Sequence, residues 1–421
     1  MTSEQIQEEI YTMGRKARAA ALQLAILPEQ TKNDILLAMA AELRAMTAQI
    51  VEENAKDLAA AEEKGLSSAM VDRLRLDAAR VDAIAAGVEK VANLSDPVGL
   101  VLDKWTRPNG IEIEQVRVPI GVIGIIYESR PNVTSDAAVL CLKSGNATIL
   151  RGGSEAIHSN RIIAQALQQG GEKAGLPEGA IQLIPFTNRE SVNVMAGMDQ
   201  YLDLIIPRGG TALINAVVSA ARMPVIKHYN GICHAYVDVA ANLEMAVDIV
   251  NNAKTQKPSV CNAMETLLVH REVAETFLPM VAEAWAASQV EIRGDETVQQ
   301  ILGESVVPVT EADWDEEYLD YIASVKVVDS LDEALAHINQ HSSQYSEVIV
   351  TEDSATAERF LRELDSACVF HNASTRFSDG EEFGFGAEIG ISTDKLHARG
   401  PMGLKELTSY QYRIRGNGEI K

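Results

Sequence analysis

One cysteine of the sequence stands where a thiol could act as a nucleophile. Cys261 follows a short polar stretch that contains Pro258, and it lies near two basic residues, Lys254 and Lys257. The thiolate is the reactive form, and nearby ammonium groups and the backbone amides of a helix start would lower the thiol pKa from about 8.5. A buried, inert cysteine is the alternative. The polar surroundings favour catalysis, with Cys261 at a helix start.

Arginine and glycine residues recur in three turns that follow short apolar runs. These turns are Glu128-Ser129-Arg130-Pro131-Asn132, Arg151-Gly152-Gly153-Ser154 and Pro207-Arg208-Gly209-Gly210-Thr211. A guanidinium beside exposed backbone amides suits a cofactor phosphate. Any one of these turns could be an ordinary tight turn, but three together are stronger evidence. The G-x-G-x-x-G fingerprint is absent from them, so a standard dinucleotide site is not supported.

Two further basic segments lie near the C-terminus. They are 372–377, which contains Arg376, and 397–403, which contains Arg399. Arginine usually forms structural ion pairs. In a chain with 60 acidic and 37 basic residues and a net charge of -23, however, basic residues on such loops are candidates for holding an anionic substrate.

Metal and disulfide sites are not indicated. The four cysteines lie far apart in sequence and form no C-x-x-C pair, so no zinc site or disulfide framework is expected and the cytoplasm is the natural compartment. His228 and His234 flank Cys233 at a spacing of six without a third nearby ligand. They are better explained as structural histidines.

Length and charge limit the class of protein. A chain of 421 residues is expected to form two or three domains at about 150 residues each. The negative net charge argues against nucleic acid or an anionic membrane as the main partner. The most apolar stretch, 118–127, has ten residues, well short of the ~20 that span a bilayer, and the acidic N-terminus lacks the features of a secretory signal.

The elements that would position these residues follow from periodicity. Residues 3–93 show apolar positions at helical spacing, and 98–118 alternate like a β-hairpin around the turn 107–110. From 121 to 226, short apolar strands alternate with helices, which predicts a parallel doubly wound sheet with ligands at the carboxyl ends of its strands. A second β/α run is expected over 265–350, with 291–322 as an acidic surface segment and a last strand over 410–414.

Six motifs in order resemble the aldehyde dehydrogenase superfamily and, within it, the γ-glutamyl phosphate reductases. They are 127–134, 149–153, 206–210, 257–262, 372–377 and 396–404. The likeness covers nearly the whole chain. Six ordered motifs are more specific than the cysteine motif would be by itself.

The resemblance implies an α/β fold of two β/α domains with parallel sheets, plus a β-ribbon for oligomerisation. It assigns 1–97 and 119–232 to a cofactor-binding domain and 233–370 to a catalytic domain that carries Cys261. Residues 98–118 and 371–421 form the oligomerisation ribbon and C-terminal segment. It further implies a homo-oligomer and functional coupling to glutamate 5-kinase.

The activity that the resemblance implies is NADPH-dependent reduction of L-glutamyl 5-phosphate to glutamate 5-semialdehyde and phosphate, the second step of proline synthesis. Cys261 would attack the acyl phosphate and form a thioester. The oxyanion would be stabilised by the Cys261 amide and by Asn132. The implied cofactor residues are Arg151, Gly152, Gly153, Arg208, Gly209, Gly210, Thr211 and Glu317. The implied substrate-binding residues are Arg130, Lys254, Arg376 and Arg399.

Two positions depart from the superfamily pattern. Oxidising aldehyde dehydrogenases carry a water-activating glutamate where this sequence has His228 or a near neighbour within 227–231, and no carboxylate lies between Val225 and Ala235. A reductase should lack that base, because water would consume the thioester before hydride arrives. Tyr345 replaces a frequent histidine, with no evident consequence.

Several alternatives remain open from the sequence. Another acylating aldehyde dehydrogenase, or a non-catalytic relative that serves in binding or assembly, would share the fold. The residues do not separate NADP from NAD, fix the oligomer size, or decide which basic residue meets the substrate's phosphate rather than its α-carboxylate.

Overall fold

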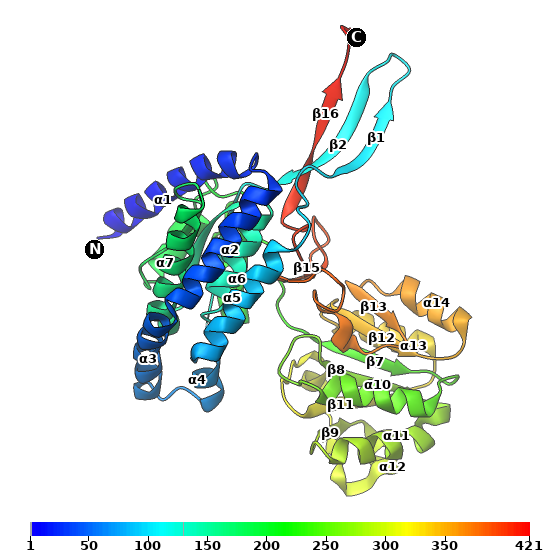
Figure 1. Cartoon of the computed structure of the whole chain (residues 1–421). Helices are drawn as coiled ribbons and strands as arrows, with labels where there is room; N and C mark the ends of the chain where they lie inside the picture. Colours follow the sequence, from blue (N-terminus) through cyan, green and yellow to red (C-terminus); the bar gives the residue numbers. More distant parts are fainter. Residues whose placement is uncertain (1, 129) are drawn as a thin grey trace. The chain divides into compact units, whose positions relative to one another are not determined.

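The chain folds into two compact units, shown together in Figure 1. The computed structural model describes residues 2–128 and 130–421. The first unit comprises residues 1–227, 385–390 and 402–421, and the second comprises 228–384 and 391–401. Each unit has its own parallel sheet and is described by itself below.

The N-terminal quarter of the first unit is helical, as its periodicity predicts. Its helices are α1 (Ser3–Leu24), α2 (Glu29–Ala45), α3 (Thr47–Glu63), α4 (Ser68–Leu74) and α5 (Ala78–Ala92). The start of α1 is fixed by a capping box, in which the Thr2 side chain accepts from the Gln5 amide and the Gln5 side chain accepts from the Thr2 amide. The Asp77 carboxylate caps α5 by a single hydrogen bond, which it accepts from the Arg80 amide.

The first sheet has four parallel strands in the order β5-β4-β3-β6. The strands are β3 (Val122–Tyr127), β4 (Ala147–Gly152), β5 (Ile181–Leu183) and β6 (Leu204–Arg208). The helices that connect and follow them are α6 (Val133–Lys143), α7 (Ile157–Lys173), α8 (Glu190–Ala196) and α9 (Thr211–Ala220). The chain moves outward from β3 to β5 and then returns to β6 on the other side of β3.

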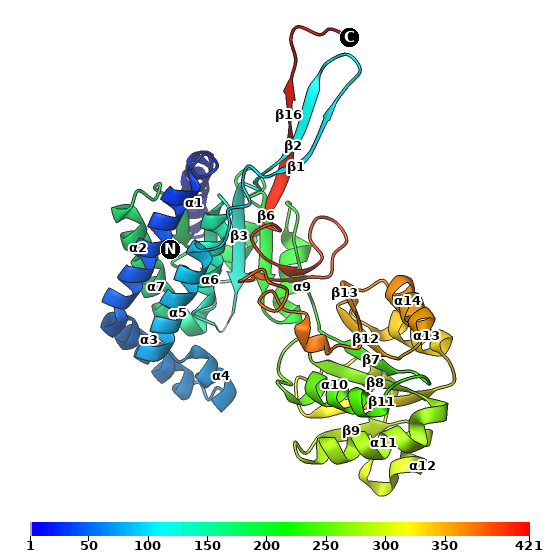
Figure 2. The same ribbon diagram turned by 45° about the vertical axis from the view of Figure 1, so that its right-hand side comes forward.

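This reversal distributes the helices over both faces of the sheet. Right-handed crossovers place α6 and α7 on one face and α8 on the other, and Figure 2 shows α6 and α9 on opposite sides of β3 and β6. The reversal of strand order between β3 and β6 is a topological switch point. Ligands bind outside the carboxyl ends of the strands at such a point.

A separate antiparallel ribbon joins segments distant in sequence. Strands β1 (Val101–Thr106) and β2 (Glu112–Pro119) form the predicted hairpin, and β16 (Thr408–Arg415) pairs with β2 along its length. In Figure 1 the red β16 lies beside the cyan β2. Large apolar side chains of this ribbon stay exposed, including Tyr412 at 54% and Ile414 at 63%.

The second unit is built on a seven-stranded parallel sheet in the order β10-β9-β11-β8-β7-β12-β13. Its strands are β7 (Cys233–Val237), β8 (Met264–His270), β9 (Glu291–Gly294), β10 (Val307–Pro308), β11 (Ile322–Val328), β12 (Ser346–Val350) and β13 (Cys368–His371). Its helices are α10 (Leu243–Thr255), α11 (Arg271–Ala286), α12 (Glu296–Leu302), α13 (Leu331–His341) and α14 (Ser354–Glu363).

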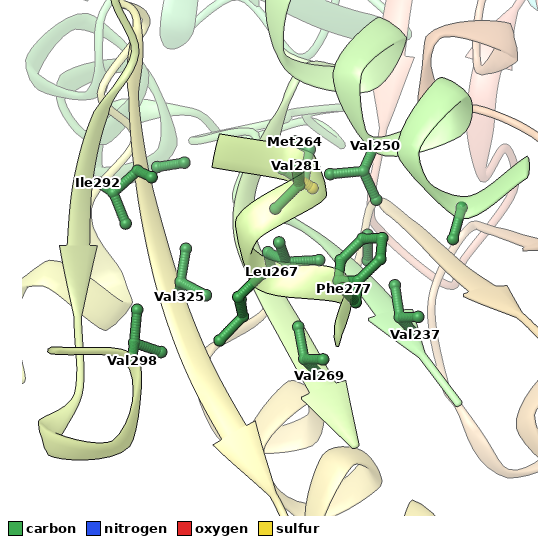
Figure 3. Packing of buried hydrophobic residues seen from close by; sticks show 14 of the residues in the cluster. Val237, Val250, Met264, Leu267, Val269, Phe277, Val281, Ile292, Val298 and Val325 are labelled. Carbon is green, nitrogen blue, oxygen red and sulfur yellow. The ribbon is translucent and has the colours of Figure 1, made fainter. Parts of the chain in front are cut away.

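The core of this unit follows from the two-residue period of its central strands. Leu267 and Val269 of β8 face one cluster with Phe277 of α11, whereas Leu268 faces a second cluster with Phe360 of α14. Figure 3 shows the first cluster, in which Phe277 lies over the sheet beside Val237. Strands buried on both faces read as continuous apolar runs, which is the pattern that predicted a parallel sheet.

The remaining short elements complete the description. They are the strands β14 (Gly390–Ser392) and β15 (Gly400–Met402), which pair with each other, and the single-turn helices Ser154–Ala156, Gly303–Ser305, Glu311–Asp315 and Thr375–Phe377. Within residues 2–128 and 130–421, no helix has the length and apolar character needed to cross a membrane.

Most of the acidic segment 291–322 is exposed or half-buried, as predicted, but Asp313 is an exception. This segment supplies β9, β10 and α12, and Asp313 is buried at 7% exposure. The Arg293 guanidinium donates to Asp313 at 2.6 Å, and the Thr310 amide and hydroxyl also donate to it. These hydrogen bonds hold the Asp313 pKa at about 2 against the opposing effect of burial.

Candidate active site

Cys261 lies in the turn between α10 and β8 of the second unit and is half-buried. The Ala263 amide closes this turn by donating to the Val260 carbonyl at 3.0 Å. The predicted helix start is wrong, because a strand follows: β8 is the central partner of both β7 and β11. The apolar residues of β8 pack on both faces of the sheet, whereas those of a helix would pack on one side only.

The main chain around Cys261 contacts the entry to β7. The Cys233 thiol donates to the Cys261 carbonyl at 3.3 Å, and the Gly231 amide donates to Glu317 Oε1 at 2.8 Å. Burial raises the pKa of Glu317, although the hydrogen bond from Gly231 opposes this rise. The structure therefore brings Glu317 into contact with Gly231, which lies just before β7.

Two motifs that are far apart in sequence meet at Asn262. The Thr375 hydroxyl donates to the Asn262 carbonyl at 2.7 Å, and the Asn262 side chain donates to the Ser378 carbonyl at 3.0 Å. Thr375 and Asn262 are both buried. The segment after β13 therefore supports the residue that follows Cys261.

Lys254 has a different environment from the predicted one. It is fully buried, and its ammonium lies 2.6 Å from Glu265 Oε2. Burial lowers the pKa of Lys254 and raises that of Glu265 to about 7, while the attraction between the two opposes both shifts. The ammonium is thus part of a buried ion pair, and the sequence prediction of a cation beside the thiol had no signal for Glu265 as its partner.

The other two predicted substrate arginines of the second unit lie on its loops. Arg376 is half-buried and donates from Nε to Gln256 at 2.9 Å. Arg399 donates to the Asp365 side chain at 2.7 Å and to the Asp365 carbonyl at 2.6 Å. A guanidinium has five N–H donors in a planar fork, so the one contact of Arg376 and the two contacts of Arg399 each leave N–H groups that could bind an anion.

His228 lies in the loop where the family resemblance would put the absent glutamate. Its ring lies against Tyr345, with ring centroids 4.9 Å apart. Tyr345 is fully buried, and its hydroxyl donates to the Ser378 carbonyl at 2.5 Å. The tyrosine thus links the His228 loop to the segment that supports Asn262. Among the residues that the structure describes, no three His, Cys, Asp or Glu side chains gather as a metal site.

In the first unit, Arg208, Gly209, Gly210 and Thr211 lie where β6 ends and α9 begins. Gly210 precedes the helix, and its amide donates to Glu128 Oε2 at 3.2 Å. Glu128 follows β3, and its own amide donates to the Arg208 carbonyl at 3.1 Å. A carboxylate therefore lies at an exposed helix N-terminus beside the switch point, which is a favourable place for an anion.

Arg151 is buried near the carboxyl end of β4. Gly152 is the last residue of this strand, and Gly153 comes directly after it. The Arg151 guanidinium donates to the Thr187 carbonyl at 2.8 Å, and burial lowers its pKa. A cavity of about 410 Å³ opens beside Thr187, and it is lined by Ile6, Ile157, His158, Arg161, Pro185, Phe186, Thr187 and Asn188.

Asn132 and Arg130 lie in the loop between β3 and α6. The Asn132 amide group donates to Asp136 Oδ2 at 2.8 Å, and Arg130 is exposed. Burial raises the pKa of Asp136 to about 6, against the effect of the Asn132 hydrogen bond. Ser129, within the same motif, lies outside the described residues.

Sequence reasoning missed three groups of residues at these sites. Gly231 and Cys233 contact Cys261 through the pairing of β7 with β8, and a single sequence gives no signal for that register. Thr187 and the cavity beside it depend likewise on tertiary packing. Glu128 could have been found, since it is an acidic residue directly after a predicted strand.

Comparisons with known proteins agree with this architecture. A model described as the aldehyde dehydrogenase family matches residues 2–303. A γ-glutamyl phosphate reductase of Geobacter metallireducens is 53% identical over 416 residues, covering 99% of each chain. One from Clostridium novyi is 56% identical over 405 residues, covering 96% of this chain and 97% of the relative.

Solved structures extend the comparison. The γ-glutamyl phosphate reductase of Thermotoga maritima has a TM-score of 0.96 and 46% identity, covering 98% of this chain and 100% of that chain. An acetylating aldehyde dehydrogenase from Geobacillus thermoglucosidasius, at 18% identity and a TM-score of 0.69, shares the fold. The predicted fold class is confirmed, and the chain belongs to the aldehyde dehydrogenase family and, within it, to the γ-glutamyl phosphate reductases.

Proposed function

We propose that this chain reduces L-glutamyl 5-phosphate to glutamate 5-semialdehyde and phosphate, as a step of proline biosynthesis. The observation that supports this most directly is the setting of Cys261. Its thiol lies in a half-buried turn next to the central strand of the second unit, and the residue after it is held by the segment around Thr375.

In this chemistry the Cys261 thiolate attacks the acyl carbonyl and forms a C–S bond, and the C–O bond to phosphate breaks. The resulting thioester stays on Cys261 until its carbonyl is reduced, and the C–S bond then breaks to release the aldehyde and regenerate the thiol. The family resemblance assigns stabilisation of the oxyanion of each tetrahedral species to the Cys261 amide and to Asn132. NADPH supplies the hydride.

The thioester must be protected from water between the two halves of the reaction. A carboxylate at the position of His228 would activate water as a general base. His228 instead lies against the Tyr345 ring. This arrangement supports the reductive direction.

The cofactor would bind the first unit through Arg151, Gly152, Gly153, Arg208, Gly209, Gly210 and Thr211. The residues present fit an anionic dinucleotide, because the N-terminus of α9 already receives a carboxylate from Glu128. The cavity beside Thr187 adjoins Arg151 near the carboxyl end of the sheet and suits the adenosine end. Arg161 in its lining would favour a cofactor that carries a 2′-phosphate, hence NADP over NAD.

Substrate recognition is assigned to Arg130, Arg376 and Arg399, with Lys254 as the fourth predicted cation. Arg376 and Arg399 each keep a fork of donors on a loop of the second unit, as an anionic amino-acid phosphate requires. Lys254 is paired with Glu265, so it would affect substrate binding by holding the α10–β8 turn in place and not by contacting the substrate.

The domain roles and the assembly follow the same proposal. Residues 1–97 and 119–232 bind the cofactor, 233–370 carry Cys261, and the ribbon of 98–118 and 371–421 joins subunits into a homo-oligomer. The exposed apolar side chains of β1 and β16 support that role. Cytoplasmic location and delivery of the labile acyl phosphate by glutamate 5-kinase complete the proposal.

The reaction run in reverse tests this function. Glutamate semialdehyde should reduce NADP⁺ only when phosphate is present, and Cys261→Ser should lower the rate by at least about a thousandfold, because serine at neutral pH is a far weaker nucleophile. Phosphate-independent reduction, or reduction that requires coenzyme A, would identify another acylating dehydrogenase. Absence of any turnover by the folded protein would indicate a non-catalytic relative.

A further inference from the structure

The two peptide groups that flank Asn262, the residue directly after Cys261, are held by side chains from distant segments. Cys233 donates to the Cys261 carbonyl at 3.3 Å, and Thr375 donates to the Asn262 carbonyl at 2.7 Å. A peptide group is planar, so a fixed carbonyl also fixes the N–H of the next residue. The direction of the Cys261 backbone, and with it the origin of the thiol side chain, is therefore set from outside the turn.

Gly231 supports the same backbone by direct contact. A Cβ at position 231 would lie 2.0 Å from the Cys261 carbonyl oxygen and 2.6 Å from its Cα. These separations are far below van der Waals contact, and the opposing atoms are main-chain atoms that a rotamer change cannot move. Only glycine fits at this position without displacing the nucleophile.

Glu317 holds Gly231 from the other side. Its carboxylate accepts a hydrogen bond from the Gly231 amide at 2.8 Å, and the residue is half-buried. A hydrogen bond to an ionised, partly buried acceptor is stronger than one between neutral groups. The contacts thus form a continuous series from Glu317 through Gly231 to Cys261.

We propose that Gly231, Cys233 and Glu317 are positioning residues that fix the backbone of Cys261 for nucleophilic attack. The proposal rests on the proposed role of Cys261, and it gives Glu317 a positioning role within its own unit beside the cofactor role that the family resemblance implies. Loosening this support shifts the thiol relative to its own amide, so it lowers kcat and the reactivity of the ligand-free thiol, and at Cys233 it does so without weakening substrate or cofactor binding.

Alkylation of Cys261 by iodoacetamide measures this effect without any turnover. The rate is followed across pH in the absence of ligands, and the peptide that contains Cys261 is quantified by mass spectrometry. Cys233→Ala should shift the pH profile and lower kcat about three- to tenfold, the size expected for one weak hydrogen bond, with KM values within about twofold. Cys233→Ser keeps a donor and should restore both. An alanine variant that behaves like the serine variant or the parent would overturn the role of Cys233.

Glu317 variants separate positioning from cofactor binding. Glu317→Ala should slow alkylation of the ligand-free enzyme and lower kcat, and Glu317→Gln, whose Oε1 still accepts from Gly231, should restore both. An alanine variant with unchanged alkylation and only a raised KM for NADPH would show that Glu317 is a cofactor ligand and would overturn the proposal.

Gly231→Ala should lower kcat at least about a hundredfold, because a displacement of about 1 Å suffices for such a loss. Its control is Gly87→Ala in α5, where an added Cβ meets nothing within 4 Å. If Gly231→Ala fails to fold, the Cys233 and Glu317 pairs still decide the question. Retained turnover in Cys261→Ser would refute the proposed function alone, since the alkylation data do not depend on turnover.

Discussion

At the scale of single residues, Lys254 is predicted as a cation beside the Cys261 thiol, and the structure pairs it with Glu265. A lysine seven positions before the cysteine reads as an exposed cation, yet its ammonium is fully buried with Glu265. Removing one member of a buried ion pair leaves the other uncompensated, which typically costs about 3–5 kcal/mol. The main consequence of changing Lys254 should therefore be on stability.

The pH dependence of this pair has a definite sign. Burial raises the pKa of Glu265 from 4.5 to about 7, so this carboxyl contributes less to stability as the pH rises from 4.5 to 7. Lys254→Met should lower the free energy of unfolding by about 3–5 kcal/mol at pH 8, where the carboxylate is charged, and by clearly less at pH 5. Urea unfolding followed by fluorescence of Trp285, fully buried in the same unit, measures both values.

The matched variant for this test is Lys254→Met combined with Glu265→Gln. Without a titrating carboxyl, its unfolding free energy should lose most of the difference between pH 5 and pH 8. Equal destabilisation of Lys254→Met at the two pH values would contradict the assignment.

Arg208 gives the second prediction at this scale. It ends β6 beside the switch point of the first sheet, so Arg208→Ala should raise the KM for NADPH about tenfold or more while kcat changes less, as expected when a charged hydrogen bond to phosphate is lost. Steady-state kinetics in both directions measure this. Arg222→Ala, on an exposed position of the same unit, is the control, and an unchanged KM would remove Arg208 from the phosphate site.

At the scale of elements, most of the chain could be predicted because helices and buried strands have distinct periods. The turn at Cys261 shows the limit. Its polar residues favour a loop, and the β/α run that begins at 265 predicts a strand after it, but the pairing of this strand with β7 and β11 is set by tertiary structure. The contacts of Cys233 and Gly231 with Cys261 arise from the same strand pairing, which is why the candidate site was predicted by its motifs and not by its supports.

The crossing of α2 and α7 gives a prediction about element packing. A Cβ at Gly170 of α7 would lie 2.6 Å from the Ala38 carbonyl and 2.8 Å from the Met39 Cα. Gly170→Ala should therefore destabilise the protein by about 1–3 kcal/mol through overpacking, despite the better helix propensity of alanine. Thermal unfolding measures the loss. Gly87→Ala, in open space on α5, should instead be neutral or stabilising by up to about 1 kcal/mol, and a similar gain at Gly170 would contradict the packing argument.

At the scale of the whole molecule, the ribbon formed by β1, β2 and β16 keeps large apolar side chains exposed to solvent. Trp105 packs edge-on against Tyr412 with ring centroids 6.0 Å apart, yet both side chains remain at least one-third exposed. A three-stranded ribbon with two free edges and exposed aromatic residues is expected to pair with another copy. The alternation over 111–118 predicted the hairpin, whereas the sequence joins the C-terminal strand to it only through the family resemblance. In the structure β16 pairs with β2.

Self-association tests this use of the ribbon. Tyr412→Glu combined with Ile414→Glu, or deletion of residues 107–110 at the hairpin tip, should shift sedimentation velocity profiles towards smaller species, because charge on the apolar face opposes burial. Leu22→Glu on α1, 76% exposed in the parent, is the control for an added surface charge. Profiles that match the parent would exclude the ribbon from the interface.

The contact between Glu128 and the start of α9 has a consequence for how the whole molecule responds to its cofactor. The protein already places an anion of its own on the Gly210 amide. A dinucleotide phosphate that binds there, as proposed, must displace the Glu128 carboxylate from the Gly210 amide. The measured binding free energy of the cofactor is therefore reduced by the free energy of the hydrogen bond that it replaces. Cofactor discrimination can then be tuned by a residue that never touches the cofactor in the final complex.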